Sequence, residues 1–391
     1  MRRYSLALVA AIGGAMGVAY AAASHGHARP PSAAQQLAAE PARDSQQDTV
    51  QIAILLDTSS SMDGLINQAR SQLWSMVDQM GRMTRVVNGK TRGVKLELAL
   101  YQYGNDTLAK ESGYIQQVLP FTGDLDRVSE KLNGLFTNGG SEYVPEVIET
   151  AATQLAWNKD ATLRFIYVAG NEEFDQGPVT AAHAMATAAA HDINVQLIFC
   201  GAKEGTWENA AKLAKSDLMS IDQNSVAQYV AAPQDAEILR IGQQINATYV
   251  AYGANGQASV ARQQKADKDS AKLSPKVALE RMQLKGKKAY DNRTWDIVDA
   301  NKNDASFLAN TPDADLPAEL QGKSLAEKQQ LVAAKTAERE ALQKQLAKLE
   351  SERNAYLAAE QAKHPSAEAP SLGTELMKTT KPVAAKKGYK F

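Results

Sequence analysis

The chain has 391 residues and a formal net charge of -1, so its overall charge gives no sign of a nucleic-acid partner. Aromatic residues make up only 6% of it, which favours one globular domain with polar, solvated extensions over a single large core. Cys200 is the only cysteine, and this excludes an internal disulfide.

The first residues have the features of a secretory signal peptide. Two arginines precede an apolar stretch from Leu6 to Tyr20, and small residues suited to cleavage follow near Ala21 to Ala23. We therefore expect residues 1–23 to be a signal peptide, with an uncleaved membrane anchor as the alternative, and residues 24–48 to be a disordered linker. No cysteine follows the apolar stretch, so lipoprotein processing is not supported. The expected location is exported, periplasmic or secreted.

Residues 49–253 alternate between apolar strand patterns and amphipathic helix patterns. Strands are predicted at residues 52–56, 94–101, 114–119, 163–169, 195–200 and 218–221. Helices are predicted at residues 65–80, 124–132, 144–157, 179–190, 207–214 and 236–252. Such alternation is typical of an α/β fold with a doubly wound, mostly parallel sheet and helices on both faces. We expect residues 114–119 to be an antiparallel edge strand and residues 236–252 to be the last helix of this domain.

The strand patterns end near residue 253, and the rest of the chain is predicted to be an α-helical C-terminal extension. Residues 254–322 have helical and irregular character, with an aromatic segment, Tyr290–Val298, that we expect to dock onto the domain. Residues 323–362 predict a long helix. Its heptad pattern places Val332 and Leu346 on one seam, but charged residues interrupt that seam, so a solvated helix and a coiled coil both remain open.

The last part, residues 363–391, is rich in lysine and has no acidic residue after Glu375. We expect a disordered tail, which leaves open a weak contact with an anionic envelope surface.

Oxygen-bearing side chains gather where three of these segments should meet. The first predicted strand ends in Asp57-Thr58-Ser59-Ser60-Ser61, and a glycine-rich turn, Thr137–Glu142, precedes a helix. The fourth predicted strand ends in Gly170-Asn171-Glu172-Glu173. Parallel α/β sheets bind ligands at the carboxyl ends of their strands, and hard oxygen donors suit Mg²⁺, Mn²⁺ or Ca²⁺. Ordinary helix capping by these residues is the alternative.

Residues 50 to about 252 resemble a von Willebrand factor type A (vWA) domain. Asp57-x-Ser59-x-Ser61 is similar to the signature of that family's metal-ion-dependent adhesion site (MIDAS), and Gly139-Gly140-Ser141 is similar to its Gly-Gly-Thr motif. The resemblance implies that Asp57, Ser59, Ser61 and Ser141 coordinate a divalent ion, with Mg²⁺ expected first and Mn²⁺ or Ca²⁺ as alternatives. The chain also resembles an exported bacterial subgroup with the motifs Asp-Thr-Ser-x-Ser-Met, Thr-Asn-Gly-Gly and Ala-Gly-Asn-Glu, which begin here at residues 57, 137 and 169.

The third motif departs from the family pattern. Gly170 stands where the family has an aspartate, so one expected carboxylate is missing. Asn171 offers a neutral oxygen and Glu172 a displaced carboxylate, and both join the predicted metal ligands. Ordinary loop polarity is the alternative for both.

These features predict a binding protein and not an enzyme. A strand ending in Asp57 resembles that of haloacid-dehalogenase-type phosphatases, but Ser59 stands where their second acid is needed. The resemblance to vWA domains implies metal-assisted capture of an exposed carboxylate on a protein partner. The alternative is a metal-independent scaffold of the cell envelope that assembles through the helix at residues 323–362.

Overall fold

The computed structural model describes most of the chain, namely residues 47–202, 204–225, 229–363 and 371–391. The predicted signal peptide and nearly all of the predicted linker lie outside these ranges. Gln47 and Asp48, which were assigned to the predicted linker, belong to the first strand.

Seven strands form one mixed sheet in the order β2-β3-β1-β5-β6-β7, with β4 also paired to β3. The strands are β1 (Gln47–Asp57), β2 (Arg85–Val87), β3 (Lys90–Tyr103), β4 (Ile115–Thr122), β5 (Leu163–Gly170), β6 (Asn194–Cys200) and β7 (Met219–Ile221). β1 is central and runs parallel to β3 and β5, which explains its unbroken apolar sequence, because such a strand is covered on both faces. β4 runs antiparallel to β3, as predicted, whereas the short β2 was not predicted.

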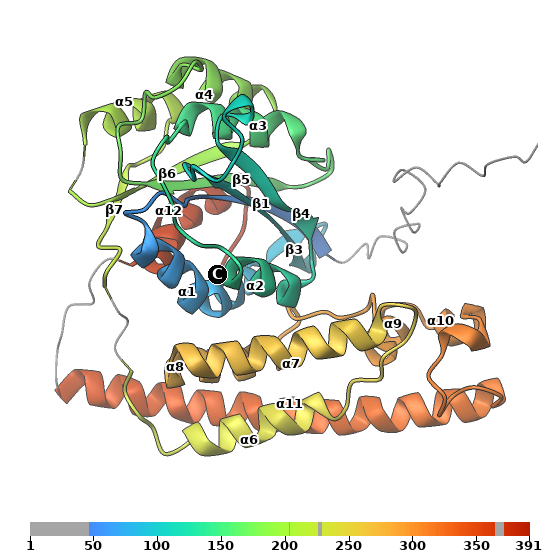
Figure 1. Cartoon of the computed structure of the whole chain (residues 1–391). Helices are drawn as coiled ribbons and strands as arrows, with labels where there is room; N and C mark the ends of the chain where they lie inside the picture. The colour runs from blue at the N-terminus through green and yellow to red at the C-terminus, as the bar shows by residue number, and fades with distance from the viewer. Residues whose placement is uncertain (1–46, 203, 226–228, 364–370) are drawn as a thin grey trace, which may run out of the picture. The chain divides into compact units, whose positions relative to one another are not determined.

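Helices cover both faces of this sheet (Figure 1). One face carries α3 (Val144–Gln154), α4 (Ala181–Ala190) and α5 (Gly205–Ala214). The other carries α1 (Asp63–Gly81), α2 (Leu125–Asn133) and α12 (Leu372–Lys386). Short 3₁₀ turns lie at η2 (Lys110–Ser112) and η3 (Asp313–Asp315). The predicted fold class is confirmed: this is a vWA/Rossmann-like α/β fold, with further helices from the C-terminal half.

The lysine-rich tail was predicted to be disordered, and for residues 371–391 this is wrong. These residues form α12, which packs between α1 and β7, and a terminal bridge that joins the backbones of Thr84 and Lys390. Leu372 and Leu376 are buried, and each contributes about 1.5–3 kcal/mol through burial. The lysines of α12 lie on its solvent side. The positive charge that suggested disorder therefore forms the polar face of an amphipathic helix.

The helices between β7 and α12 pack mainly on one another (Figure 1). They are α6 (Asp235–Asn246), α7 (Gly256–Leu273), α8 (Pro275–Leu284), α9 (Ile297–Asn303), α10 (Phe307–Asn310) and α11 (Leu325–Lys363). We predicted that the segment containing α6 would be the last helix of the sheet domain. Instead Ile238, Ile241 and Ile245 of α6 pack against residues of α8 and α11. The helix that covers the sheet at this point is α12, supplied from the far end of the chain.

The aromatic segment docks onto the domain through Tyr290, which is buried and donates to Asp126 of α2 at 2.6 Å. Trp295 is buried instead against Tyr249, which follows α6.

The apolar seam of the long helix α11 packs against other helices of the same chain. Val332 and Leu346 are buried against neighbouring helices, and Arg339 donates to Asp296 at 2.6 Å. No helix of the described ranges combines the length and apolar character needed to cross a membrane.

Candidate functional site

The carboxyl edge of the sheet brings three strand ends together at the centre of the fold. Asp57 at the end of β1 is in register with Tyr103 of β3, and Leu56 is in register with Ala169 of β5. After β1 the chain builds the sheet outward on the β3 side, and β5 then begins the other side of β1. The direction in which successive strands are added therefore reverses at β1, and open α/β sheets bind ligands at such a switch point.

The turn after β1 folds its oxygens around Asp57. The backbone N–H of Ser59 donates to Asp57 Oδ1 at 2.7 Å, and the hydroxyls of Ser59 and Ser61 lie 3.3 Å apart. Ser61 in turn lies 3.2 Å from Asn171 Oδ1, beyond the end of β5. The structure thus brings together Asp57, Ser59, Ser61 and Asn171 as predicted from the sequence.

The glycine-rich turn is bound directly to the turn after β1. The Ser60 N–H donates to the Gly139 carbonyl at 2.9 Å, and the Asn138 N–H donates to the Thr58 carbonyl at 2.9 Å. Gly139 has φ +70°, a conformation that favours glycine, and a Cβ there would meet the Asp106 carboxyl group. These bonds place Ser141 in the loop beside the site, where it is half-buried.

Glu142, the residue after Ser141, was not among the predicted site residues. Its side chain turns inward and is only 4% exposed. A Cβ on Gly104 would lie 2.9 Å from both Asp57 Oδ1 and Glu142 Cγ, so the two acids flank the same glycine. The available signal was its position directly after Gly-Gly-Ser, but no pattern in the sequence says that this side chain points into the protein.

Two buried carboxylates therefore share this edge, and their environment disfavours the charged form. Burial raises the pKa of Asp57 to about 7, hydrogen bonds from Ser59 lower that pKa, and the charges of Glu142 and Glu172 raise it again. Burial, and then the charge of Glu172, also raises the pKa of Glu142. Within the described residues, Asp57 Oδ2 is buried with no hydrogen-bond partner. A buried carboxylate oxygen of this kind costs free energy unless a proton or a cation joins it.

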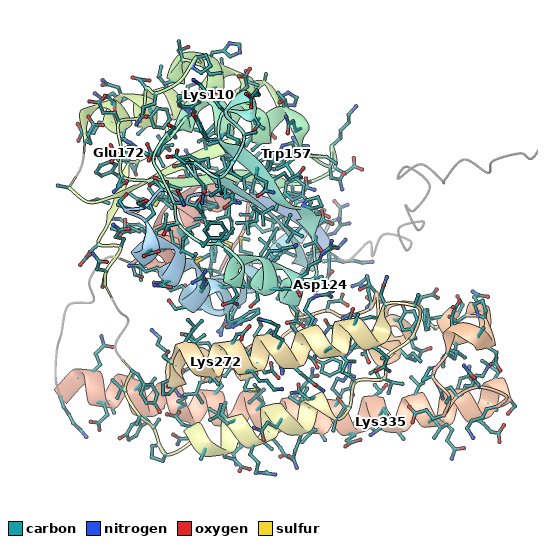
Figure 2. All side chains as sticks on the ribbon, in the orientation of Figure 1. Lys110, Asp124, Trp157, Glu172, Lys272 and Lys335 are labelled. Atoms are coloured by element: carbon teal, nitrogen blue, oxygen red, sulfur yellow. The ribbon has the colours of Figure 1, made fainter. Side chains whose placement is uncertain are left out.

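The donor set fits a hard divalent cation better than a soft one. It offers carboxylate and hydroxyl oxygens, the ligands that Mg²⁺, Mn²⁺ and Ca²⁺ prefer. Among the described residues, no group of three or more Asp, Glu, His or Cys could hold a metal ion by itself. A cation here would therefore need the serine hydroxyls and water. Glu172 is exposed on the loop after β5, and Figure 2 labels it in the α/β part of the molecule.

Comparisons with known proteins give distant structural likenesses only. No protein-family model and no curated protein matches the chain. Proximal thread matrix protein 1 from the mussel byssus is 10% identical over 44% of this chain, with a TM-score of 0.34. This chain spans 42% of that protein's length.

Two further solved structures are similar at the same level. BatB from Bacteroides thetaiotaomicron is 19% identical, with 45% of this chain and 91% of that chain covered and a TM-score of 0.35. The VWA domain of SpRpn10 is 13% identical, with 47% and 99% covered and a TM-score of 0.33.

Proposed function

We propose that this chain is an exported, non-enzymatic binding protein that holds a divalent cation at Asp57 and uses it to capture a carboxylate of a protein partner. The observation that supports this proposal most directly is the buried, unpartnered Oδ2 of Asp57. The other oxygen of this carboxylate accepts from the Ser59 N–H, and the hydroxyls of Ser59 and Ser61 lie 3.3 Å apart in the same turn. Mg²⁺ is the proposed ion, with Mn²⁺ or Ca²⁺ as alternatives, because all three accept oxygen ligands and retain water that a partner can displace.

The surroundings of the site suit contact with another protein. Phe136, at the start of the glycine-rich turn, is 59% exposed. The Asn105 side chain donates to its carbonyl at 2.9 Å, which fixes the backbone that carries this ring. Exposed aromatic side chains on a fixed backbone bury large apolar areas at interfaces. The scaffold alternative gains no support from α11, because the seam residues Val332 and Leu346 pack within the chain.

Thermal unfolding of the full chain with each ion, and with chelator, tests the proposal. A ligand that binds only the folded state stabilises it by about 2.7 kcal/mol at a hundred times its Kd, so the Tm should rise by about 3 °C or more. Asp57→Ala should abolish the rise. Asp217→Ala, which changes an exposed acid elsewhere on the α/β part, should leave it unchanged. An equal rise in wild type and Asp57→Ala contradicts the metal site.

The partner is tested separately by pull-down from an envelope extract, with Mg²⁺ and with chelator. We expect proteins retained only in the presence of Mg²⁺ and only by wild type, and an excess of acetate should release them. Retention that is insensitive to both Mg²⁺ and Asp57→Ala contradicts metal-assisted capture.

A further inference from the structure

The end of β5 has no room for the carboxylate that its sequence lacks. A Cβ at Gly170 would lie 2.6 Å from the Tyr103 hydroxyl and 3.4 Å from Cζ2 of Trp207. The Tyr103 hydroxyl is fixed there, since it is buried and donates to the Ala169 carbonyl at 2.9 Å. The absence of an acid at Gly170 is therefore built into the packing and is not a simple loss of one side chain.

Glu142 brings a carboxylate to the same aspartate from another direction. It precedes α3, and the glycine-rich turn that leads to it is bonded to the turn after β1. A Cβ at Gly104 would touch both Glu142 and Asp57, and a Cβ at Gly140 would lie 3.1 Å from Glu142 Oε1. Glycine at both positions thus leaves space for the Glu142 side chain against Asp57.

The Glu142 carboxylate is weakly bound where it lies. Gln176 Nε2 lies 3.5 Å from Glu142 Oε2, which is long for a hydrogen bond, and Ser59 hydrogen-bonds to the same carboxylate. Ser59 also hydrogen-bonds to Asp57, so one serine joins the two acids. Beside them lies the buried, unpartnered Asp57 Oδ2. Asp57 Oδ1 lies on the side of Glu142, whereas Asp57 Oδ2 lies on the side of Gly170, where a Cβ would be 3.3 Å from it. Two neighbouring buried acids, one with an unpartnered oxygen, are an arrangement that a cation stabilises.

We propose that Glu142 supplies the second carboxylate ligand of the divalent ion at Asp57, in place of the acid that Gly170 cannot carry. This proposal rests on the proposed function, in which that ion binds. The two carboxylates and the hydroxyls of Ser59 and Ser61 leave about two positions in an octahedral Mg²⁺ or Mn²⁺ shell for water or the Ser141 hydroxyl. The charge of the ion is then balanced by the protein itself.

Mn²⁺ titration of the full chain, followed by the electron paramagnetic resonance of free Mn²⁺, tests this assignment. Glu142→Gln keeps the size of the side chain and removes its charge, and we expect a Kd at least about tenfold weaker than wild type. Glu319→Gln makes the same substitution at an exposed acid of the C-terminal helical half, and we expect its Kd to stay within about threefold of wild type. Water-proton relaxation provides a second readout, because the lost ligand should be replaced by one additional water on the bound Mn²⁺.

The outcomes separate this inference from the proposed function. If wild type binds no Mn²⁺, Mg²⁺ or Ca²⁺, both are wrong. If wild type and Glu142→Gln bind Mn²⁺ equally and with equal hydration, Glu142 is not a ligand, while the site at Asp57 stands. Should Glu142→Gln fail to fold, Glu142→Asp serves instead. Shortening the side chain should then weaken Mn²⁺ binding at least about fivefold, and an unchanged Kd overturns the assignment.

Discussion

Two regions of this molecule bury charge in opposite ways. Where α8 meets the α/β layer, the fully buried Arg281 lies 2.7 Å from Asp126 of α2 and 2.8 Å from Asp267 of α7. Its guanidinium also lies over the Trp74 ring of α1, 4.5 Å from the centroid. At the carboxyl edge of the sheet, by contrast, Asp57 has only Ser59 to offset its burial and faces further acids.

The difference separates charge that fixes the structure from charge that awaits a ligand. The attraction between paired buried ions offsets much of the cost of removing them from water, and these pairs set how the helices α7 and α8 dock. Lys285 extends the network by pairing with Asp267 at 2.5 Å. Figure 2 shows Asp124 on the side of α2 that faces α7, where Arg262 reaches it at 3.2 Å. Buried acids without a cation are instead typical of binding sites.

The largest effect is expected from Arg281→Leu. This change leaves Asp126 and Asp267 buried without their main partner, and breaking a buried pair in this way costs about 3–5 kcal/mol. Urea unfolding gives the value. Arg240→Leu is the matched control, because Arg240 pairs with Glu237 at the surface and the loss of an exposed pair should change stability far less. A similar small loss for both variants would remove the distinction between the paired network and an ordinary surface pair.

A second effect is expected from Glu280 on α8, which is neither closely paired like Asp126 nor without a base like Asp57. Burial raises its pKa to about 7, and its nearest base, Lys276, is 4.0 Å away. The folded state then holds this proton to a higher pH than the unfolded state, so stability is highest below the unfolded pKa and falls as pH rises towards 7. The loss amounts to at most about 3 kcal/mol.

Glu280→Gln should reduce this pH dependence, measured as the free energy of unfolding at pH 4.5, 6 and 7.5. The raised pKa of Asp57 should leave a remaining slope of the same sign. An unchanged slope in the variant would show that Glu280 is not the group responsible.

The smallest effect has the opposite sign. In chelator at pH 8, Asp57→Asn should raise the free energy of unfolding by about 1–3 kcal/mol, because the amide removes an unpaired buried charge. Asp126→Asn makes the same substitution at a paired carboxylate and should destabilise the protein. Chemical denaturation of both variants beside wild type is the measurement. Destabilisation by Asp57→Asn would mean that this carboxylate is structurally paired after all.

The sheet could be predicted from the sequence because each strand has its own local pattern. The strands at 52–56, 163–169 and 195–200 are short apolar runs bounded by polar turns, and all three lie in the core of the sheet. The helix at 124–132 was also predicted, and it begins after Asp124, whose side chain accepts from the Arg127 N–H. β2 was missed because a strand of three residues, with one of them exposed and none fully buried, has too short a pattern to recognise.

The covering helix was misplaced for a different reason. The helix at 236–252 and the tail at 371–391 are both amphipathic, and amphipathicity shows that a face is buried without showing against what. Only the folded chain shows that α6 packs on α8 and α11, while Tyr167 of β5 bonds to Thr380 of α12.

By itself, then, the sequence determined the α/β class and the oxygens of Asp57, Ser59 and Ser61 at a strand end. These depend on neighbours in the chain and on the two-residue period of a strand. The tertiary structure decided the rest: Tyr103 fills the space at Gly170, Glu142 turns inward beside Asp57, and the C-terminal helix closes the sheet. Each of these depends on contacts between segments far apart in the chain, which no local pattern encodes.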